Sequence, residues 1–107
     1  MMNNLITKQK IKEVIKKVVE GYQPKKIILF GSYVDGIPTS DSDIDLFIVK
    51  DTNESPKERR KKVERILWRC GVAKDVFVFT EKEFKEYKDI PGTIMYEADK
   101  FGKVIYG

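Results

Sequence analysis

The chain of 107 residues contains no histidine, and this absence removes several kinds of chemistry. Acid–base catalysis by imidazole, nucleophilic triads that contain histidine and histidine metal sites are all excluded. The single cysteine, Cys70, cannot form a disulfide within the chain, and we expect it to be a small core residue. Carboxylates therefore remain as the candidate metal ligands.

Long apolar runs are also missing. No run approaches the roughly 20 residues that span a bilayer, and the N-terminus lacks a secretory hydrophobic region. A reducing, cytoplasmic environment without membrane association is therefore the default expectation. The length predicts one domain over residues 1–107, with a single core.

The charge balance is modestly positive, with 21 Lys and Arg against 17 Asp and Glu and a formal charge of +4. This balance suits an anionic substrate such as a nucleoside triphosphate or RNA, and equally suits ordinary solubility. Lysines in the first predicted helix are consistent with a nucleic-acid patch, but a solvated helix face is the simpler interpretation. Direct nucleic-acid binding is therefore not the favoured function, although the sequence leaves it open.

Hydrophobic periodicity predicts that helices alternate with strands. Residues 6–22 carry an apolar stripe at helical spacing, with Gly21 as the stop signal. Capping boxes at Ser55 and Thr80 begin two more helices, of which the first ends at Gly71. The other predicted elements are strands at 27–30, 44–49 and 76–79, a last helix over 93–101 and an edge strand at 103–106. The fold class is α/β (α+β), a small mixed sheet with helices packed on it.

Two aspartates begin the strand at 44–49. Asp43 and Asp45 share a face because alternate strand residues point the same way, with Cα atoms roughly 6–7 Å apart. Carboxylates this close repel each other unless a cation lies between them. Mg²⁺ commonly binds through one or two carboxylates together with substrate phosphates. The pattern therefore predicts metal-dependent chemistry on a nucleotide.

A third carboxylate, Asp75, immediately precedes the strand at 76–79. Burial of a lone carboxylate beside apolar strand residues is costly without a partner. A divalent cation shared with Asp43 and Asp45 would be that partner. The alternative is that Asp75 pairs with Lys74 in solvent, at the end of a turn.

A Gly-Ser pair follows the strand at 27–30. Gly31 allows the backbone to approach a ligand closely. Free N–H groups at the start of a short helix, with the Ser32 hydroxyl, favour phosphate oxygens. The spacing from Gly31 to Gly36 is that of a P-loop, but the Lys-Ser/Thr pair of that motif is missing.

The acidic loop also resembles part of a calcium-binding loop. Asp41, Asp43 and Asp45 match the first three ligands of an EF-hand, but Leu46 occupies the place of its required glycine. A Ser/Asp-rich turn without function is the remaining alternative for residues 39–45.

Gly31-Ser32, followed ten residues later by Ser-Asp-Ile-Asp-Leu at 42–46 and then by a distant acidic residue, resembles the nucleotidyltransferase superfamily typified by DNA polymerase beta. More narrowly, nearly the whole chain resembles the minimal nucleotidyltransferases. The resemblance implies a nucleotidyltransferase fold, and assigns roles to six residues. Nucleotide binding falls to Gly31, Ser32 and Ser42, and catalysis and the binding of two Mg²⁺ ions to Asp43, Asp45 and Asp75.

The resemblance also implies an activity, the transfer of a nucleoside monophosphate from ATP or another NTP to a hydroxyl. Small members of this family are often antitoxins of HEPN-domain ribonuclease toxins and modify a toxin tyrosine with AMP. The chain is similar to them in length, so we expect a HEPN partner with a tyrosine acceptor. A non-catalytic antitoxin that acts by binding, and nucleotidyl transfer to RNA or a small molecule, are the alternatives.

One residue departs from the family pattern. Relatives commonly have arginine in Gly-Ser-x-Ala-Arg-Gly, where this chain has Asp35. An anion therefore replaces a cation near the expected phosphate site. Lys82 or a partner protein are candidates to compensate for this change.

Overall fold

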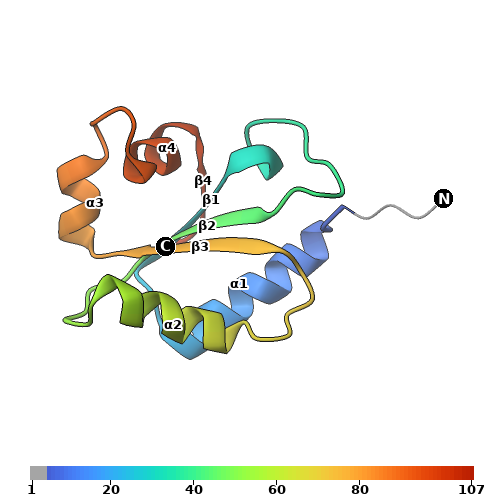
Figure 1. Ribbon diagram of the computed structural model, residues 1–107, viewed down its shortest axis with the longest axis horizontal. Helices are drawn as coiled ribbons and strands as arrows, with labels where there is room; N and C mark the ends of the chain where they lie inside the picture. The colour runs from blue at the N-terminus through green and yellow to red at the C-terminus, as the bar shows by residue number, and fades with distance from the viewer. Residues whose placement is uncertain (1–4) are drawn as a thin grey trace.

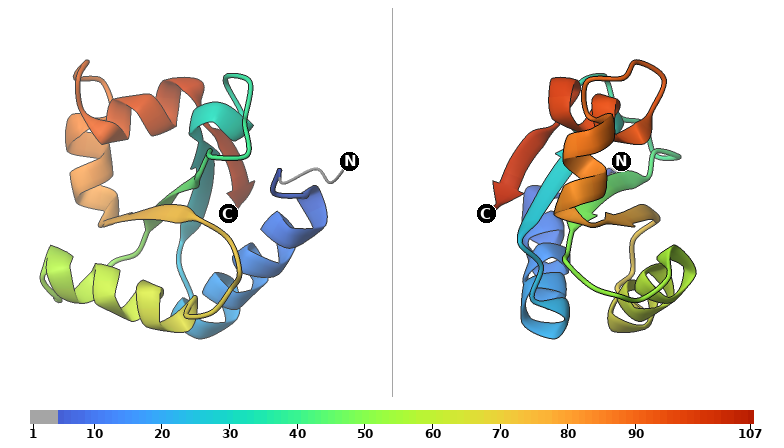
Figure 2. Two further views of the ribbon diagram at one scale, coloured as in Figure 1. Left: turned by 45° about the vertical axis from the view of Figure 1, so that its right-hand side comes forward. Right: turned by 90° about the vertical axis from the view of Figure 1, so that its left-hand side faces the viewer.

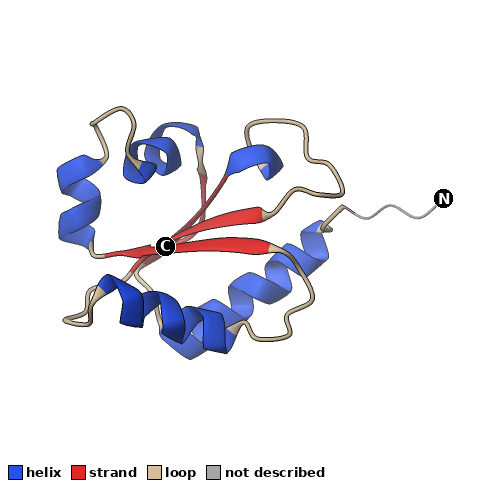
Figure 3. Cartoon of the chain, viewed as in Figure 1, coloured by secondary structure: helices blue, strands red, loops and turns tan. Residues whose placement is uncertain are grey.

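A computed structural model of the protein describes residues 5–107. A four-stranded sheet in the order β3-β2-β1-β4 forms its centre, with helices on both faces (Figures 1 and 3). The elements along the chain are α1 Lys8–Tyr22, β1 Lys26–Phe30, the 3₁₀ turn η1 Gly31–Tyr33, β2 Ile44–Val49, α2 Pro56–Ile66, β3 Lys74–Phe79, α3 Glu81–Tyr87, α4 Ile94–Phe101 and β4 Lys103–Tyr106. The predicted mixed sheet with packed helices is confirmed. Within residues 5–107, no helix has the length and apolar character needed to cross a membrane.

Strand pairing brings three chain segments together at one end of the sheet. β2 runs antiparallel to β1 and parallel to β3, while β4 pairs antiparallel with the other side of β1. The register places Phe30 opposite Asp45, and Asp45 beside Asp75. The end of β1 therefore meets the beginnings of β2 and β3, where the sequence places the candidate site.

The alternation of side chains along β2 separates two apolar cores. Its even-numbered residues pack with α1 and α2, and Phe47 and Val49 pack with α3 and α4. The Phe47 ring stacks on Phe79 with centroids 5.3 Å apart. By the same alternation, Asp45 lies on the α3–α4 face of the sheet.

The first helix ends at Tyr22, as the sequence predicts, but Gly21 is not the residue that stops it. Gly21 remains helical, and a Cβ added there would lie 3.1 Å from Cγ2 of Ile66 on α2. The left-handed C-cap is Gln23, with φ 53° and ψ 56°, whose amide donates to the Val19 carbonyl at 3.1 Å. The predicted stop at Gly21 is wrong because this glycine serves close helix packing instead of chain reversal.

The second helix ends earlier than predicted. α2 stops at Ile66, and the chain turns through Arg69, whose φ of 60° is left-handed, before it reaches Gly71. Cys70 lies in this turn and is only 4% exposed. Its predicted place in the core is confirmed, although it belongs to a turn and not to a helix.

The capping box of α3 is complete and also receives an ion pair from α2. Thr80 Oγ1 accepts from the Glu83 amide at 3.2 Å, and Glu83 Oε1 accepts from the Thr80 amide at 2.7 Å. Arg59, which is 6% exposed, donates from Nη1 to the same carboxylate at 2.8 Å. At the start of α2, Ser55 accepts from the Glu58 amide at 3.3 Å, so this half of the predicted box forms.

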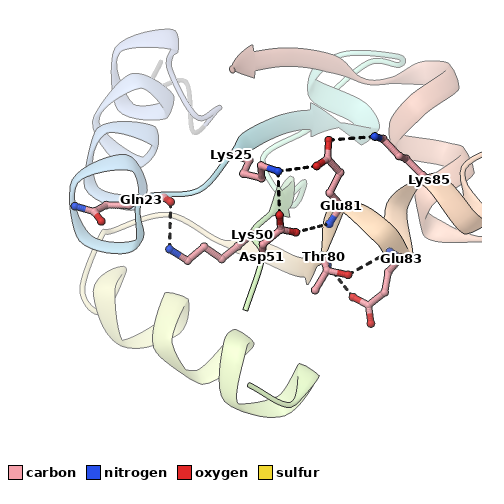
Figure 4. Close-up of polar contacts among 8 residues, drawn as sticks. All are labelled: Gln23, Lys25, Lys50, Asp51, Thr80, Glu81, Glu83 and Lys85. Carbon is pink, nitrogen blue, oxygen red and sulfur yellow. Dashed lines mark hydrogen bonds and ion pairs between the residues drawn. The ribbon is translucent and has the colours of Figure 1, made fainter. Parts of the chain in front are cut away.

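A network of exposed ion pairs joins the elements at the opposite end of the sheet (Figure 4). Lys25 Nζ lies 2.9 Å from Asp51 Oδ2 and 2.6 Å from Glu81 Oε2, and Asp51 Oδ1 accepts from the Glu81 amide. A hydrogen bond to Glu81 and a weaker contribution from a hydrogen bond to Asp51 raise the pKa of Lys25 above its usual value. This network connects the residue before β1 with the end of β2 and the start of α3.

Candidate active site

Asp45 and Asp75 are neighbours in the parallel pair β2–β3. Their Cα atoms are register partners, and adjacent strands lie about 4.8 Å apart, so both side chains emerge from the same face. Burial, the charges of Asp75 and Asp43, and a hydrogen bond to Asp75 together raise the pKa of Asp45 to about 6. This end of the sheet therefore concentrates negative charge that a cation would relieve.

Asp43 is half-buried one residue before β2, and its charge is one of those that act on Asp45. In the part of the chain that the structure describes, no three acidic or cysteine side chains are gathered as a group that could hold a metal ion. The structure thus pairs Asp45 with Asp75 and places Asp43 near them, without closing a three-ligand site. The metal-binding role of the three aspartates stays a prediction.

The Lys74 side chain is engaged elsewhere and does not pair with Asp75. β3 begins at Lys74, so Asp75 lies within the strand and not just before it. Lys74 Nζ is 3.6 Å from Glu64 Oε2 of α2, while Asp75 points to the other face of the sheet. The alternative of a Lys74–Asp75 solvent pair is therefore wrong.

The Gly31 turn lies directly against the Asp45 carboxylate. Gly31 has a φ of +82°, and a Cβ added to it would overlap Asp45 Oδ2. The amides of Val34 and Asp35 both donate to the Gly31 carbonyl, at 3.0 and 2.8 Å, and close the turn. The predicted proximity of the Gly-Ser pair to the aspartates is thus present for Gly31 and Asp45.

The other two predicted nucleotide-binding residues occupy different surroundings. Ser32 is half-buried in η1, and a Cβ on Gly36 would lie 3.3 Å from its Cα, so the turn folds back on itself. Ser42 Oγ accepts from the Thr39 amide at 2.9 Å, and the Ser42 amide donates to the Thr39 carbonyl. The Ser42 hydroxyl therefore shapes the loop that delivers Asp43, and nucleotide binding by Ser32 and Ser42 stays a prediction.

Sequence reasoning missed the residues that support this turn. The Tyr33 hydroxyl accepts from the Ile6 amide at 3.0 Å and fixes η1 to the segment before α1. The Phe30 ring packs on Phe77 of β3 with centroids 5.8 Å apart, beneath the strand ends that carry Asp45. No local sequence signal predicts either contact, because each joins segments that are distant in the chain.

No lysine of α3 lies where it could supply the positive charge that is lost when Asp35 takes the place of the family arginine. Asp35 is exposed, and its amide helps to close the Gly31 turn. Lys82 lies with Asp51 and Glu81 at the opposite end of the sheet. The suggested compensation by Lys82 is therefore wrong.

The side-chain chemistry of the three aspartates fits a magnesium ion, although the structure does not gather all three in one closed site. All three side chains offer only carboxylate oxygens, the ligands that Mg²⁺ prefers. Across residues 5–107, no lysine or arginine forms an ion pair with Asp43, Asp45 or Asp75. Burial and the charges of Asp75 and Asp43 raise the pKa of Asp45, and a bound cation would offset both effects.

The chain is similar to two proteins whose names describe adenylyl or nucleotidyl transfer. A protein of Methanocaldococcus jannaschii named "putative protein adenylyltransferase" is 41% identical over 54 residues, which cover 47% of this chain and 54% of that protein. The match thus spans about half the length of this curated relative. A crystal structure of a putative nucleotidyltransferase from Sulfolobus solfataricus superimposes with a TM-score of 0.59 and 25% identity, over 76% of this chain and 73% of that one.

The family model described as "Polymerase beta, Nucleotidyltransferase" matches residues 9–107. This range includes the Gly31 turn and all three aspartates. The predicted resemblance is therefore confirmed, and the chain belongs to the polymerase beta nucleotidyltransferase family.

Proposed function

We propose that the protein transfers AMP from ATP to a tyrosine hydroxyl of a HEPN-domain toxin, in a reaction that depends on Mg²⁺, and thereby acts as the antitoxin. The observation that carries this proposal is the in-register pair Asp45–Asp75, held against Gly31 and influenced by the charge of Asp43. Family membership and the relative named as a protein adenylyltransferase support it.

The reaction forms one bond to phosphorus and breaks another, and the acceptor hydroxyl releases its proton to Asp75 or to solvent. The acceptor oxygen attacks the α-phosphorus of ATP, the bond from that phosphorus to the bridging oxygen breaks, and pyrophosphate leaves. When bound, Mg²⁺ lowers the pKa of the acceptor hydroxyl and stabilises charge on the leaving oxygens. Asp43 and Asp45 would hold the metal, and Asp75 would complete the site and help to activate the acceptor hydroxyl.

The Gly31 turn provides the other half of the proposed site. The first N–H groups of a helical turn have no acceptor within that turn. Gly31 and Ser32 at the start of η1 would hold the triphosphate, with its phosphates beside the metal at Asp45. The loop closed by Ser42 and Thr39 would keep Asp43 in place.

Label transfer tests the proposal. The protein is incubated with ATP labelled at the α-phosphate, Mg²⁺ and the HEPN-domain toxin proposed as its partner. Transfer should label a tyrosine of that protein and fall by about 10²-fold or more with Asp45→Asn. Asp41→Asn is the matched control, because Asp41 is an exposed residue of the same loop.

The alternative functions predict other results in this assay. Label on RNA or on a small molecule, with none on protein, would show that the protein is a nucleotidyltransferase with a different acceptor from the one proposed. Tight binding to the HEPN-domain protein without any transfer would identify a non-catalytic antitoxin.

A further inference from the structure

A groove runs along the outer side of the sheet, between α1 and the edge strand β4. Two adjoining hollows of about 530 and 440 Å³ form it. We call it the α1–β4 groove, and define its apolar floor as Ile11, Ile15, Val19, Val104 and Ile105.

The rim of the α1–β4 groove carries positive charge without acidic partners. Four lysines line it, and no acidic residue does. None of the four forms an ion pair with any residue in 5–107, although Lys10 on the same helix pairs with Glu13 at 3.3 Å. The rim lysines are Lys8, Lys12, Lys16 and Lys103.

One wall of the groove is an open sheet edge. β4 pairs with β1 on one side only, and its other side faces outward beside α1 (Figure 2). Val104 is 51% exposed on this strand. An edge strand has unpaired N–H and C=O groups that an extended segment from another protein can pair with.

The α1–β4 groove continues toward the candidate active site. The second hollow is also lined by Tyr33 and Val34, which follow directly after Gly31 and Ser32. A segment seated in the groove would therefore approach the turn that is proposed to hold the triphosphate.

We propose that the α1–β4 groove docks the protein acceptor through an extended segment that carries both apolar and acidic residues on the face turned toward α1. The segment adds to the free edge of β4, its apolar side chains cover the floor and its carboxylates face the rim lysines. The identification of the docked protein as the acceptor rests on the proposed function. A second copy of this chain fits poorly, because its own lysines would face the rim lysines. A nucleic acid also fits poorly, because it would leave the apolar floor without apolar contacts.

A peptide-binding measurement tests this proposal without any nucleotide. The probe is a short fluorescein-labelled peptide, followed by anisotropy, in which valine and glutamate take turns at every second position and threonine fills the positions between them. Wild type should bind it, and Lys12→Glu combined with Lys16→Glu should weaken binding by about tenfold or more. Lys17→Glu is the matched control, since Lys17 is exposed on α1 outside the groove, and should bind like wild type. A valine–lysine peptide should not bind.

Amide hydrogen exchange locates the bound peptide. Binding should protect amides of β4, because the added strand supplies their acceptors. No binding by wild type, equal binding by the double variant, or protection elsewhere than β4 and α1 would overturn the proposal. Tighter binding of an RNA oligonucleotide than of the peptide would assign the groove to nucleic acid, and lysine-dependent dimers in sedimentation would assign it to a second copy.

The two proposals can fail separately. Asp45→Asn should bind the peptide normally, because Asp45 lies outside the groove. Peptide binding without any AMP transfer would refute the proposed function alone. AMP transfer that persists at wild-type rates in the Lys12→Glu, Lys16→Glu variant would refute the docking inference alone.

Discussion

The Cα of Gly31 lies directly against the carboxylate of Asp45. A Cβ added to Gly31 would overlap Oδ2 of Asp45 and lie 3.1 Å from its Cγ. Glycine is required for two reasons, because the φ of +82° is left-handed and because any side chain would displace the carboxylate. The two halves of the family motif are thus in contact.

This contact predicts the effect of Gly31→Ala. Left-handed backbone costs an alanine about 1 kcal/mol, and the overlap with Asp45 adds to this and moves the carboxylate. We expect lower stability in urea denaturation and a loss of AMP transfer of about tenfold or more. Gly92→Ala is the control, because Gly92 has a φ of +91° and no atom within 4 Å of an added Cβ. Equal stability and activity of the two variants would contradict the account.

The raised pKa of Asp45 predicts how stability varies with pH in the absence of Mg²⁺. Because its folded pKa of about 6 lies above the usual value, the folded state binds the proton more tightly than the unfolded state. Stability contributed by this group should therefore fall as pH rises from about 4 to about 6. Asp45→Asn should lose this contribution and exceed wild type in thermal stability at about pH 8. If the stability of wild type relative to Asp45→Asn rose between about pH 4 and about pH 6, the predicted direction would be wrong.

Mg²⁺ should restore the stability that the ionised Asp45 carboxylate removes from wild type at about pH 8. A ligand that binds only the folded state stabilises it by about 2.7 kcal/mol at 100 times its dissociation constant. We expect Mg²⁺ to raise the melting temperature of wild type at about pH 8, and EDTA to return it to the starting value. Asp45→Asn should respond much less. An equal response of both proteins would place the ion elsewhere.

The neighbours of Asp45 should affect its titration unequally. The charge of Asp75 raises the pKa of Asp45 more than that of Asp43 does, and Asp75 also forms a hydrogen bond to it. Asp75→Asn should therefore lower the pKa of Asp45 further than Asp43→Asn, as followed by carboxyl ¹³C chemical shifts. The reverse order would show that the β2–β3 register does not set this charge cluster.

The ion pair between α2 and α3 predicts a stability effect away from the site. Arg59→Met leaves Glu83 without its buried partner, and should cost about 1–3 kcal/mol after allowance for the partial exposure of Glu83. Lys61→Met on the same helix should have a much smaller effect, because its pair with Glu58 spans 3.9 Å at an exposed position. Urea denaturation of the two variants provides the comparison. Equal losses would mean that burial of Arg59 adds nothing.

Much of the fold could be predicted from the sequence because its apolar runs are short and clearly bounded. The run at 44–49 is β2 to the residue, and the Thr80–Glu83 capping box begins α3 as predicted. The cap of α1 at Gln23 could not be predicted, because the expected stop, Gly21, is held in the helix by its packing on Ile66. Such tertiary packing overrides a local stop signal.

The candidate site could be predicted in part. The two-residue spacing predicts a shared face for Asp43 and Asp45 only within one strand, and β2 begins at Ile44, so Asp43 lies just outside it. The pairing of Asp45 with Asp75 depends on the parallel register of β2 and β3, which no local pattern contains. The Ser42 hydroxyl illustrates the same limit, because only the folded loop shows that it bonds to the Thr39 amide.

Metal binding in the presence of a nucleotide tests the central claim most directly. Mn²⁺, used in place of Mg²⁺, is titrated into the protein with a non-hydrolysable ATP analogue, and bound metal is measured by electron paramagnetic resonance. Wild type and Asp41→Asn should bind Mn²⁺ equally, while Asp45→Asn and Asp75→Asn should bind it about tenfold more weakly or worse. Equal binding by all four proteins would contradict a metal site at these aspartates.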